Sequence, residues 1–167
     1  MYELRPQRTN KKAESLIILF FVGAAALFLL SVPLKGIPFL WVIQLLAVML
    51  LVASVYLVTR YVTKGFIYRI EEAEGGADLT VTEVASGGRR QITVCRVSLS
   101  GIREAVVDTD GGELKRLRRG QRKIYDYRPD LAPARSIVLL SEECGVECVI
   151  LLAYDERLLE LASRSKM

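Results

Sequence analysis

The feature of this sequence best suited to chemistry is a short basic run, KRLRRGQRK, at residues 115–123. Guanidinium and ammonium groups bind phosphate and carboxylate groups. The run could therefore contact the anionic headgroups of a membrane or an acidic protein surface, or it could form the solvated face of a short helix. The candidate surface or lipid contacts are its six cationic side chains: Lys115, Arg116, Arg118, Arg119, Arg122 and Lys123.

Nucleic acid is a poor partner for this run. Aromatic residues, which stack on bases, are not interleaved with its basic residues. From Arg60 to the end of the sequence there are 18 basic and 17 acidic residues, so the positive excess is local. A nucleic-acid-binding domain usually has a basic excess over a whole face. We therefore expect no nucleic acid as a partner.

The residue types that most enzymes use are absent or poorly spaced. The sequence has no histidine, which excludes His-based triads and HExxH zinc sites. Cys144 and Cys148 lack the CxxC spacing of a redox or zinc motif, and Cys95 stands alone. The short glutamate runs near residues 71–74 and 142–143 are too small for calcium, which needs about six to eight oxygen ligands. We expect a protein that is not an enzyme and that holds neither metal nor cofactor, with an enzyme as the minor alternative.

Two apolar runs precede the basic run, at residues 15–32 and 37–59. A helix rises about 1.5 Å per residue and the bilayer core is about 30 Å thick, so each run is long enough to cross it. The break PLKG at 33–36 contains both proline and glycine. We expect a two-helix transmembrane hairpin over residues 15–64, with its turn near 33–36. A cleaved signal peptide is the alternative, but the sequence lacks a small-x-small cleavage site.

The charges that flank the apolar runs predict the orientation of the hairpin. Basic residues lie before the first run and after the second, whereas the break between the runs contains only Lys35. The flanking residues are Arg5, Arg8, Lys11, Lys12, Arg60, Lys64 and Arg69. Because basic residues stay on the cytoplasmic side, we expect a two-span protein of the cell membrane with both termini in the cytoplasm. Residues 1–14 would form a basic cytoplasmic tail, and 65–167 a cytoplasmic domain.

The pattern of residues 65–167 predicts about seven strands and a closing helix. The strands fall at 66–73, 79–84, 89–99, 101–109, 123–128, 135–141 and 146–154, and a short helix interrupts them near 110–121. Consecutive short strands joined by tight turns favour an antiparallel β-sandwich or barrel, so the class is α+β. In the C-terminal helix Asp155 is the expected N-cap. Leu158, Leu161 and Ala162 form the apolar face that would close one end of the barrel.

This order of elements resembles the bacterial membrane proteins that carry a pleckstrin-homology-like (PH-like) domain. The passage VCRVSLSGIREAVV, residues 94–107, is similar to a passage common in them. Residues 123–162 resemble the end of small uncharacterised two-helix membrane proteins of clostridia-like Firmicutes. The resemblance implies a PH-like fold at a membrane, without catalytic residues. The first hairpin loop, EEAEGGAD, is acidic, and the basic run is expected at the opposite end of the domain, so phosphoinositide binding is not implied.

Two functions remain open. The first is a membrane-anchored, non-enzymatic interaction module whose β-domain binds a protein partner or an anionic lipid surface. The second is a subunit of a larger membrane assembly that is contacted through its transmembrane helices. For the second, residues 23–26 form a small-residue patch, GAAA, that would let another helix approach closely. The oligomeric state is open in both.

Overall fold

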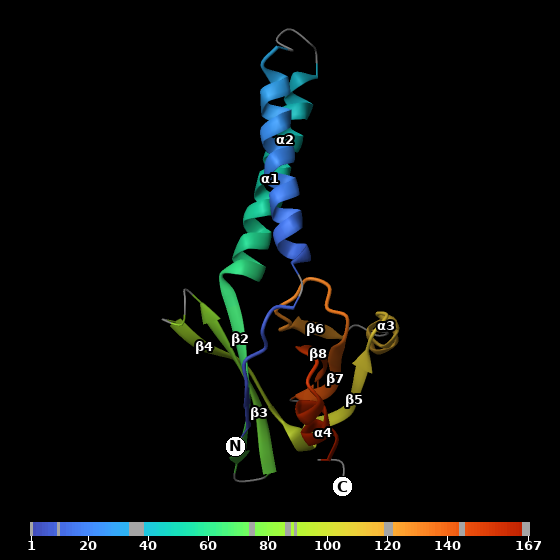
Figure 1. Cartoon of the computed structure of the whole chain (residues 1–167). Helices are drawn as coiled ribbons and strands as arrows, with labels where there is room; N and C mark the ends of the chain where they lie inside the picture. Colours follow the sequence, from blue (N-terminus) through green and yellow to red (C-terminus); the bar gives the residue numbers. More distant parts are fainter. Residues whose placement is uncertain are drawn as a thin grey trace.

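Two long apolar helices lie side by side and lead into a β-domain made of two sheets (Figure 1). The computed structural model describes residues 2–9, 11–33, 39–73, 76–85, 88, 90–118, 122–143 and 146–164. We call the end of the β-domain next to these helices the hairpin end, and the opposite end the far end. Within the described residues, apolar helices, two sheets and a C-terminal helix confirm the predicted α+β class.

The two apolar runs form helices α1 (Lys12–Ser31) and α2 (Leu40–Leu57), and a π-helical turn (Val58–Val62) extends α2. Both are long and apolar enough to cross a membrane. Only 11% of the first candidate span and 17% of the second are buried, whereas the core helix of a soluble protein is mostly buried. The predicted turn near 33–36 falls largely on residues 34–38, which lie outside the described part.

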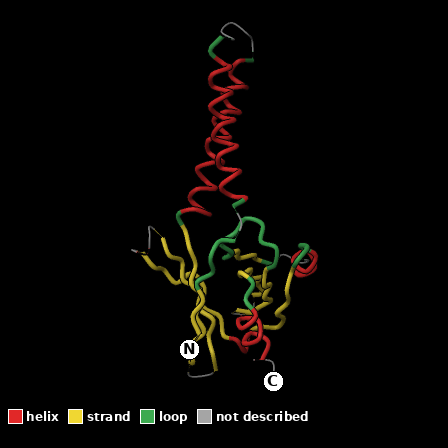
Figure 2. The backbone as a smooth tube through the Cα atoms, in the orientation of Figure 1, coloured by secondary structure: helices red, strands yellow, loops and turns green. Residues whose placement is uncertain are grey.

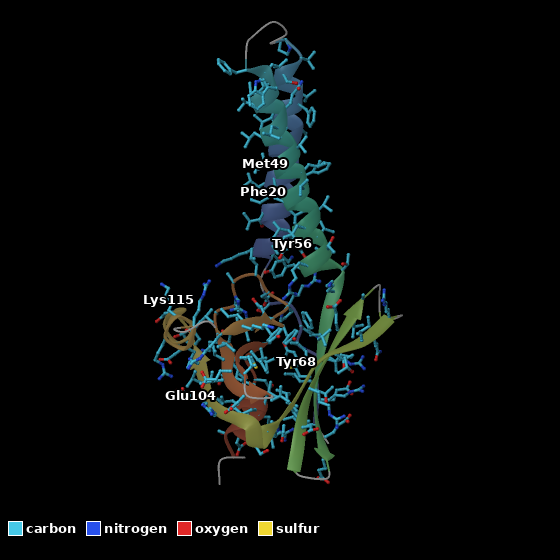
Figure 3. The ribbon with its side chains drawn as sticks, turned by 180° about the vertical axis from the view of Figure 1, so that it is seen from behind. Phe20, Met49, Tyr56, Tyr68, Glu104 and Lys115 are labelled. Carbon is cyan, nitrogen blue, oxygen red and sulfur yellow. The ribbon has the colours of Figure 1, made fainter. Side chains whose placement is uncertain are left out.

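Small residues bring α1 and α2 close together. Ala24 and Ala47 are 1% and 0% exposed, and a Cβ added to Gly23 would meet Leu50 Cδ1 at 3.5 Å. Part of the predicted GAAA patch is therefore used inside the hairpin, while its other two alanines are exposed. The outward faces are apolar, and Met49 projects from α2 in Figure 3.

The first sheet is antiparallel, with the order β1-β2-β3-β4. Its strands are β1 (Tyr2–Leu4), β2 (Lys64–Ala73), β3 (Gly76–Ala85) and β4 (Arg90–Ser98). Lys64 lies opposite Ala85, so β2 begins and β3 ends at the hairpin end. The first β-hairpin, in which Ala73 lies opposite Gly76, therefore points to the far end.

Strand β1 was not expected from the sequence, which predicts a tail over residues 1–14. In the structure Tyr2 lies opposite Ile70 and Leu4 opposite Tyr68, so part of this segment completes the sheet. A strand of three residues is too short to show an alternating pattern. Because β1 precedes α1 and β2 follows α2, both ends of the helical hairpin enter the same sheet.

The second sheet is mixed, with the order β5-β7-β8-β6. Its strands are β5 (Ile102–Asp108), β6 (Lys123–Asp126), β7 (Ser136–Glu143) and β8 (Val146–Ala153). Strand β7 is antiparallel to both of its neighbours, but β6 runs parallel to β8. The expectation of a wholly antiparallel domain is thus wrong at β6. A helix before β6 and a loop after it replace the tight turns that antiparallel neighbours need.

Tyr68 ties the two sheets together across the core. Its side chain is fully buried, at the position labelled in Figure 3. The Tyr68 hydroxyl donates to the Tyr127 carbonyl oxygen at 2.7 Å and accepts from the Ala153 N–H at 3.2 Å. Burial raises the pKa of this hydroxyl well above its usual value. The only polar group of the ring is therefore satisfied inside the core, as burial requires.

Helix α4 (Glu156–Arg164) covers the core as the sequence predicts. Leu158 and Ala162 are each 1% exposed and belong to the core cluster, and Leu161 packs against it. Asp155 Oδ1 accepts the N–H of Leu158 at 2.9 Å, which is the expected N-cap.

Candidate interaction surfaces

The first half of the basic run lies on helix α3 (Gly112–Leu117), which follows β5. The helix begins after Gly111, whose φ of 74° is left-handed and suits glycine. Leu117 is 4% exposed because it packs on a second apolar cluster, on the outer face of the β7–β8 pair. Helix α3 therefore lies flat on this sheet, nearer the hairpin end than the far end (Figure 1). The side chain of Lys115 points away from the sheet (Figure 3).

Most of the predicted contact residues lie on one side of the domain. Some of them are exposed, and others are paired with residues of the domain itself. Lys115, Arg118 and Lys123 are exposed. Within the described part of the chain, none of these three side chains forms an ion pair. Arg119 lies outside the described residues. The remaining two, Arg116 and Arg122, are engaged with the domain itself.

Arg116 and Arg122 hold α3 and its connection against the sheet. Arg116 pairs with Glu104 of β5 and, at 2.8 Å, with Glu113, and the hydrogen bond to Glu104 raises its pKa. Arg122 pairs with Glu147 of β8 at 2.6 Å and donates to the Leu117 carbonyl oxygen at 2.7 Å. The predicted run is therefore partly structural, and among its described residues Lys115, Arg118 and Lys123 remain for an outside partner.

Other basic residues fix the helical hairpin to the β-domain. Arg8 donates to the Val62 carbonyl oxygen at 2.8 Å, which joins the chain before α1 to the end of the π-helical turn. Arg60 donates to the carbonyl oxygen of Asp126 in β6, and its guanidinium lies 5.1 Å from the centre of the Phe66 ring. These contacts fasten the described residues at both ends of the helical hairpin to each other and to the β-domain.

A cavity of about 410 Å³ lies at the hairpin end, between the segment before α1 and the loop between β6 and β7. Both segments are loops at the foot of the helices in Figure 2. Its charged lining residues are Arg5, Arg128, Arg135 and Asp130. No sequence motif predicts this cavity, because its walls lie more than a hundred residues apart along the chain.

A second hollow, of about 310 Å³, lies between the edge strands β4 and β6. Tyr125 and Tyr127 stack along it with an angle of 2° between their rings, and the Tyr127 hydroxyl donates to the Val94 carbonyl oxygen at 3.3 Å. Burial, and then the neighbouring Cys95, raise the pKa of Tyr127. Cys95 and Cys148 line the hollow and are not joined in a disulfide, while Cys144 lies outside the described residues.

The fold and these surfaces define a β-domain attached to two candidate membrane-spanning helices. Among the described residues, no group of three or more His, Cys, Asp or Glu side chains converges as metal ligands would. Comparison of the chain with family models, with curated proteins and with solved structures gave no match.

Proposed function

We propose that this chain is a membrane-anchored, non-enzymatic interaction module of the cell membrane. Helices α1 and α2 anchor it, both termini lie in the cytoplasm, and its PH-like β-domain binds an anionic lipid surface or a protein partner. The observation that carries the proposal is the entry of both ends of the helical hairpin into one sheet, through β1 and β2.

This double connection keeps the β-domain close to the membrane surface. A single residue, Thr63, separates the π-helical turn from β2, and Arg8 bonds across to Val62. The hairpin end therefore stays near the headgroups, where charges act over about 8 Å at physiological salt. A domain on a long flexible linker would spend most of its time beyond that range.

The distribution of charge favours an anionic lipid surface. At the hairpin end the sheet carries the exposed Arg90, which begins β4, while Lys64, which begins β2, is paired with Glu83 at 2.9 Å. At the far end it carries the exposed Glu71 and Glu72 near the first hairpin, while Asp78 is paired with Arg96. Each basic residue near an anionic leaflet contributes about 1 kcal/mol of attraction. The domain would thus turn its basic end and the exposed cations of α3 toward the headgroups.

Hydrogen–deuterium exchange of the full chain in lipid nanodiscs tests this function. We expect the amides of α3 and of the hairpin end to exchange more slowly in phosphatidylglycerol than in phosphatidylcholine. The protection should fade in high salt and in the variant Lys115→Gln/Arg118→Gln/Lys123→Gln, which leaves the paired Arg116 and Arg122 intact. Equal exchange in the two lipids at low salt would contradict lipid-surface binding.

Purification from gently solubilised membranes distinguishes a protein partner bound by the β-domain from one bound by the helices. Loss of a co-purified protein in the same triple variant would identify the β-domain as its contact surface. Loss on Ala25→Leu, on the exposed side of α1, with retention in the triple variant would favour a subunit held through its helices.

A further inference from the structure

We propose that the cavity at the hairpin end binds the phosphate-bearing headgroup of an anionic phospholipid. This inference rests on the function proposed above and deepens it, because it assigns lipid recognition to a defined site. The residues concerned, Arg5 and Arg135, lie outside the basic run at 115–123.

Hydrogen bonds to a buried carboxylate hold one wall of the cavity in place. Asp130 is 5% exposed, and its Oδ2 accepts the Thr9 N–H at 3.1 Å and the Thr9 hydroxyl at 2.7 Å. These two bonds fasten the segment before α1 to the loop between β6 and β7. The volume of about 410 Å³ falls within the usual range for small-ligand sites, about 300–1,000 Å³.

The charges of the cavity favour an anion. Arg128 is held by Asp126 through bonds of 2.9 and 2.7 Å, so its charge is compensated. Among the described lining residues the carboxylate is that of Asp130, which accepts hydrogen bonds from Thr9. Arg135 is exposed and lies 5.6 Å from the centre of the Tyr154 ring.

Arg5 supplies the second cation, although it is paired with Glu3 at 2.9 Å. Its side chain is 69% exposed, and it shares the Glu3 carboxylate with Arg69. Because two arginines share that one carboxylate, a net positive charge remains beside the cavity that Arg5 and Arg135 line. Guanidinium groups bind phosphodiesters through paired charge-assisted hydrogen bonds.

The rest of the lining favours an amphiphile over a bare ion. Leu4, Pro6, Pro133 and Ala134 present apolar surface between the arginines. A phosphate joined to glycerol and the first acyl carbons would bury that surface, whereas inorganic phosphate would leave it wet. The segment before α1 lines the cavity. This segment lies at the foot of the helices (Figure 2), which is near the headgroups if α1 spans the membrane.

Titration of the detergent-solubilised full chain tests the site by native mass spectrometry and calorimetry. The probes are dihexanoyl phosphatidylglycerol, dihexanoyl phosphatidylcholine, glycerol 3-phosphate and inorganic phosphate. We expect one phosphatidylglycerol per chain and weaker binding of the other three. Arg5→Gln/Arg135→Gln should weaken it about tenfold or more, since two charge-assisted hydrogen bonds are lost. Ala134→Leu should weaken it by filling the cavity without any change of charge.

The matched control is Lys115→Gln/Arg118→Gln, which removes two exposed cations from α3 and should leave this binding unchanged. Unchanged binding in Arg5→Gln/Arg135→Gln would overturn the site, and so would equal binding of glycerol 3-phosphate, because the ligand would then be a soluble phosphate ester. If α3 is still protected in anionic nanodiscs, the proposed function survives that failure. If the protection is missing as well, both proposals fail.

Discussion

The hydroxyl of Tyr2 donates a hydrogen bond of 2.6 Å to Oδ1 of Asp155, the same oxygen that caps helix α4. The bond joins the strand before the helical hairpin to the last helix of the domain. Burial, and then Asp155, raise the pKa of the Tyr2 hydroxyl. The first strand and the N-terminus of the last helix are thus joined at one carboxylate.

We expect Tyr2→Phe to lower the free energy of unfolding by about 1 kcal/mol, the usual net value of a hydrogen bond. Asp155→Ala should cost about 1–2 kcal/mol, because it removes the helix cap as well. Denaturant unfolding of the full chain in detergent would measure both. In a double-mutant cycle the two losses should not add, and strict additivity would mean that the bond contributes nothing to stability.

Stability should fall in alkaline solution. The pKa values of Tyr2, Tyr68 and Tyr127 are raised in the folded chain, while tyrosines of the unfolded chain ionise near pH 10. The tyrosine contribution is therefore complete below about pH 10 and is lost as the pH rises toward the folded-state pKa values. Unfolding midpoints measured from pH 8 to 11 should drop at the alkaline end, with a smaller drop in Tyr68→Phe. A flat profile would contradict the raised pKa values.

Leu158→Asp should destabilise the β-domain by several kcal/mol, because it places a charge in the buried core cluster. Ser163→Asp puts the same group on the exposed face of α4 and should change stability by no more than about 0.5 kcal/mol. Thermal melting of both variants gives the comparison. Equal melting temperatures would mean that α4 does not close the core.

Tags fused at Met1 and Met167 should lie on the same side of the membrane. Pairing of β1 with β2 requires this of any hairpin that spans a bilayer, and the flanking charges put that side in the cytoplasm. Labelling of intact cells and of inverted vesicles would test it. Labelling of the C-terminal tag from outside the cell would refute the orientation.

Ala47→Leu should separate α1 from α2, since Ala47 is 0% exposed in their contact. Overpacking of this kind costs about 1–3 kcal/mol. Ala25→Leu, on the exposed side of α1, is the control and should leave the hairpin stable. Thermal unfolding in detergent, monitored through aggregation, would rank the stability of the two variants. If Ala25→Leu were the less stable variant, the described contact between α1 and α2 would be wrong.

The sequence predicts those elements whose residues repeat with a clear period. The apolar runs, the strands of the β2–β3 hairpin and the face of α4 all follow from local patterns. Strand β1 does not, since three residues carry no period, and its pairing depends on Tyr68, which lies beyond both helices. Local sequence does not predict the parallel pairing of β6 with β8 either, because this pairing depends on the path of the helix before β6 and of the loop after it.

The candidate surfaces were foreseen only in part. Composition locates the basic run, but partners such as Glu104 and Glu147 lie on other strands, so the sequence cannot separate structural arginines from available ones. The cavity at the hairpin end depends on a contact between Thr9 and Asp130 that no spacing rule predicts.

The place of β1 in the sheet sets the order in which the protein can be made. The strand leaves the ribosome first, and its partner around Tyr68 follows about 60 residues later, which takes roughly 3–13 s at usual rates of synthesis. Both apolar helices are produced in that interval. The sheet can therefore be completed only after the hairpin has emerged, and a hairpin that crosses the bilayer once instead of twice would leave β1 and β2 on opposite sides. If the hairpin spans a bilayer, closure of the domain would thus depend on correct insertion, and a misinserted chain would expose the unpaired edge of β2 to cellular proteases.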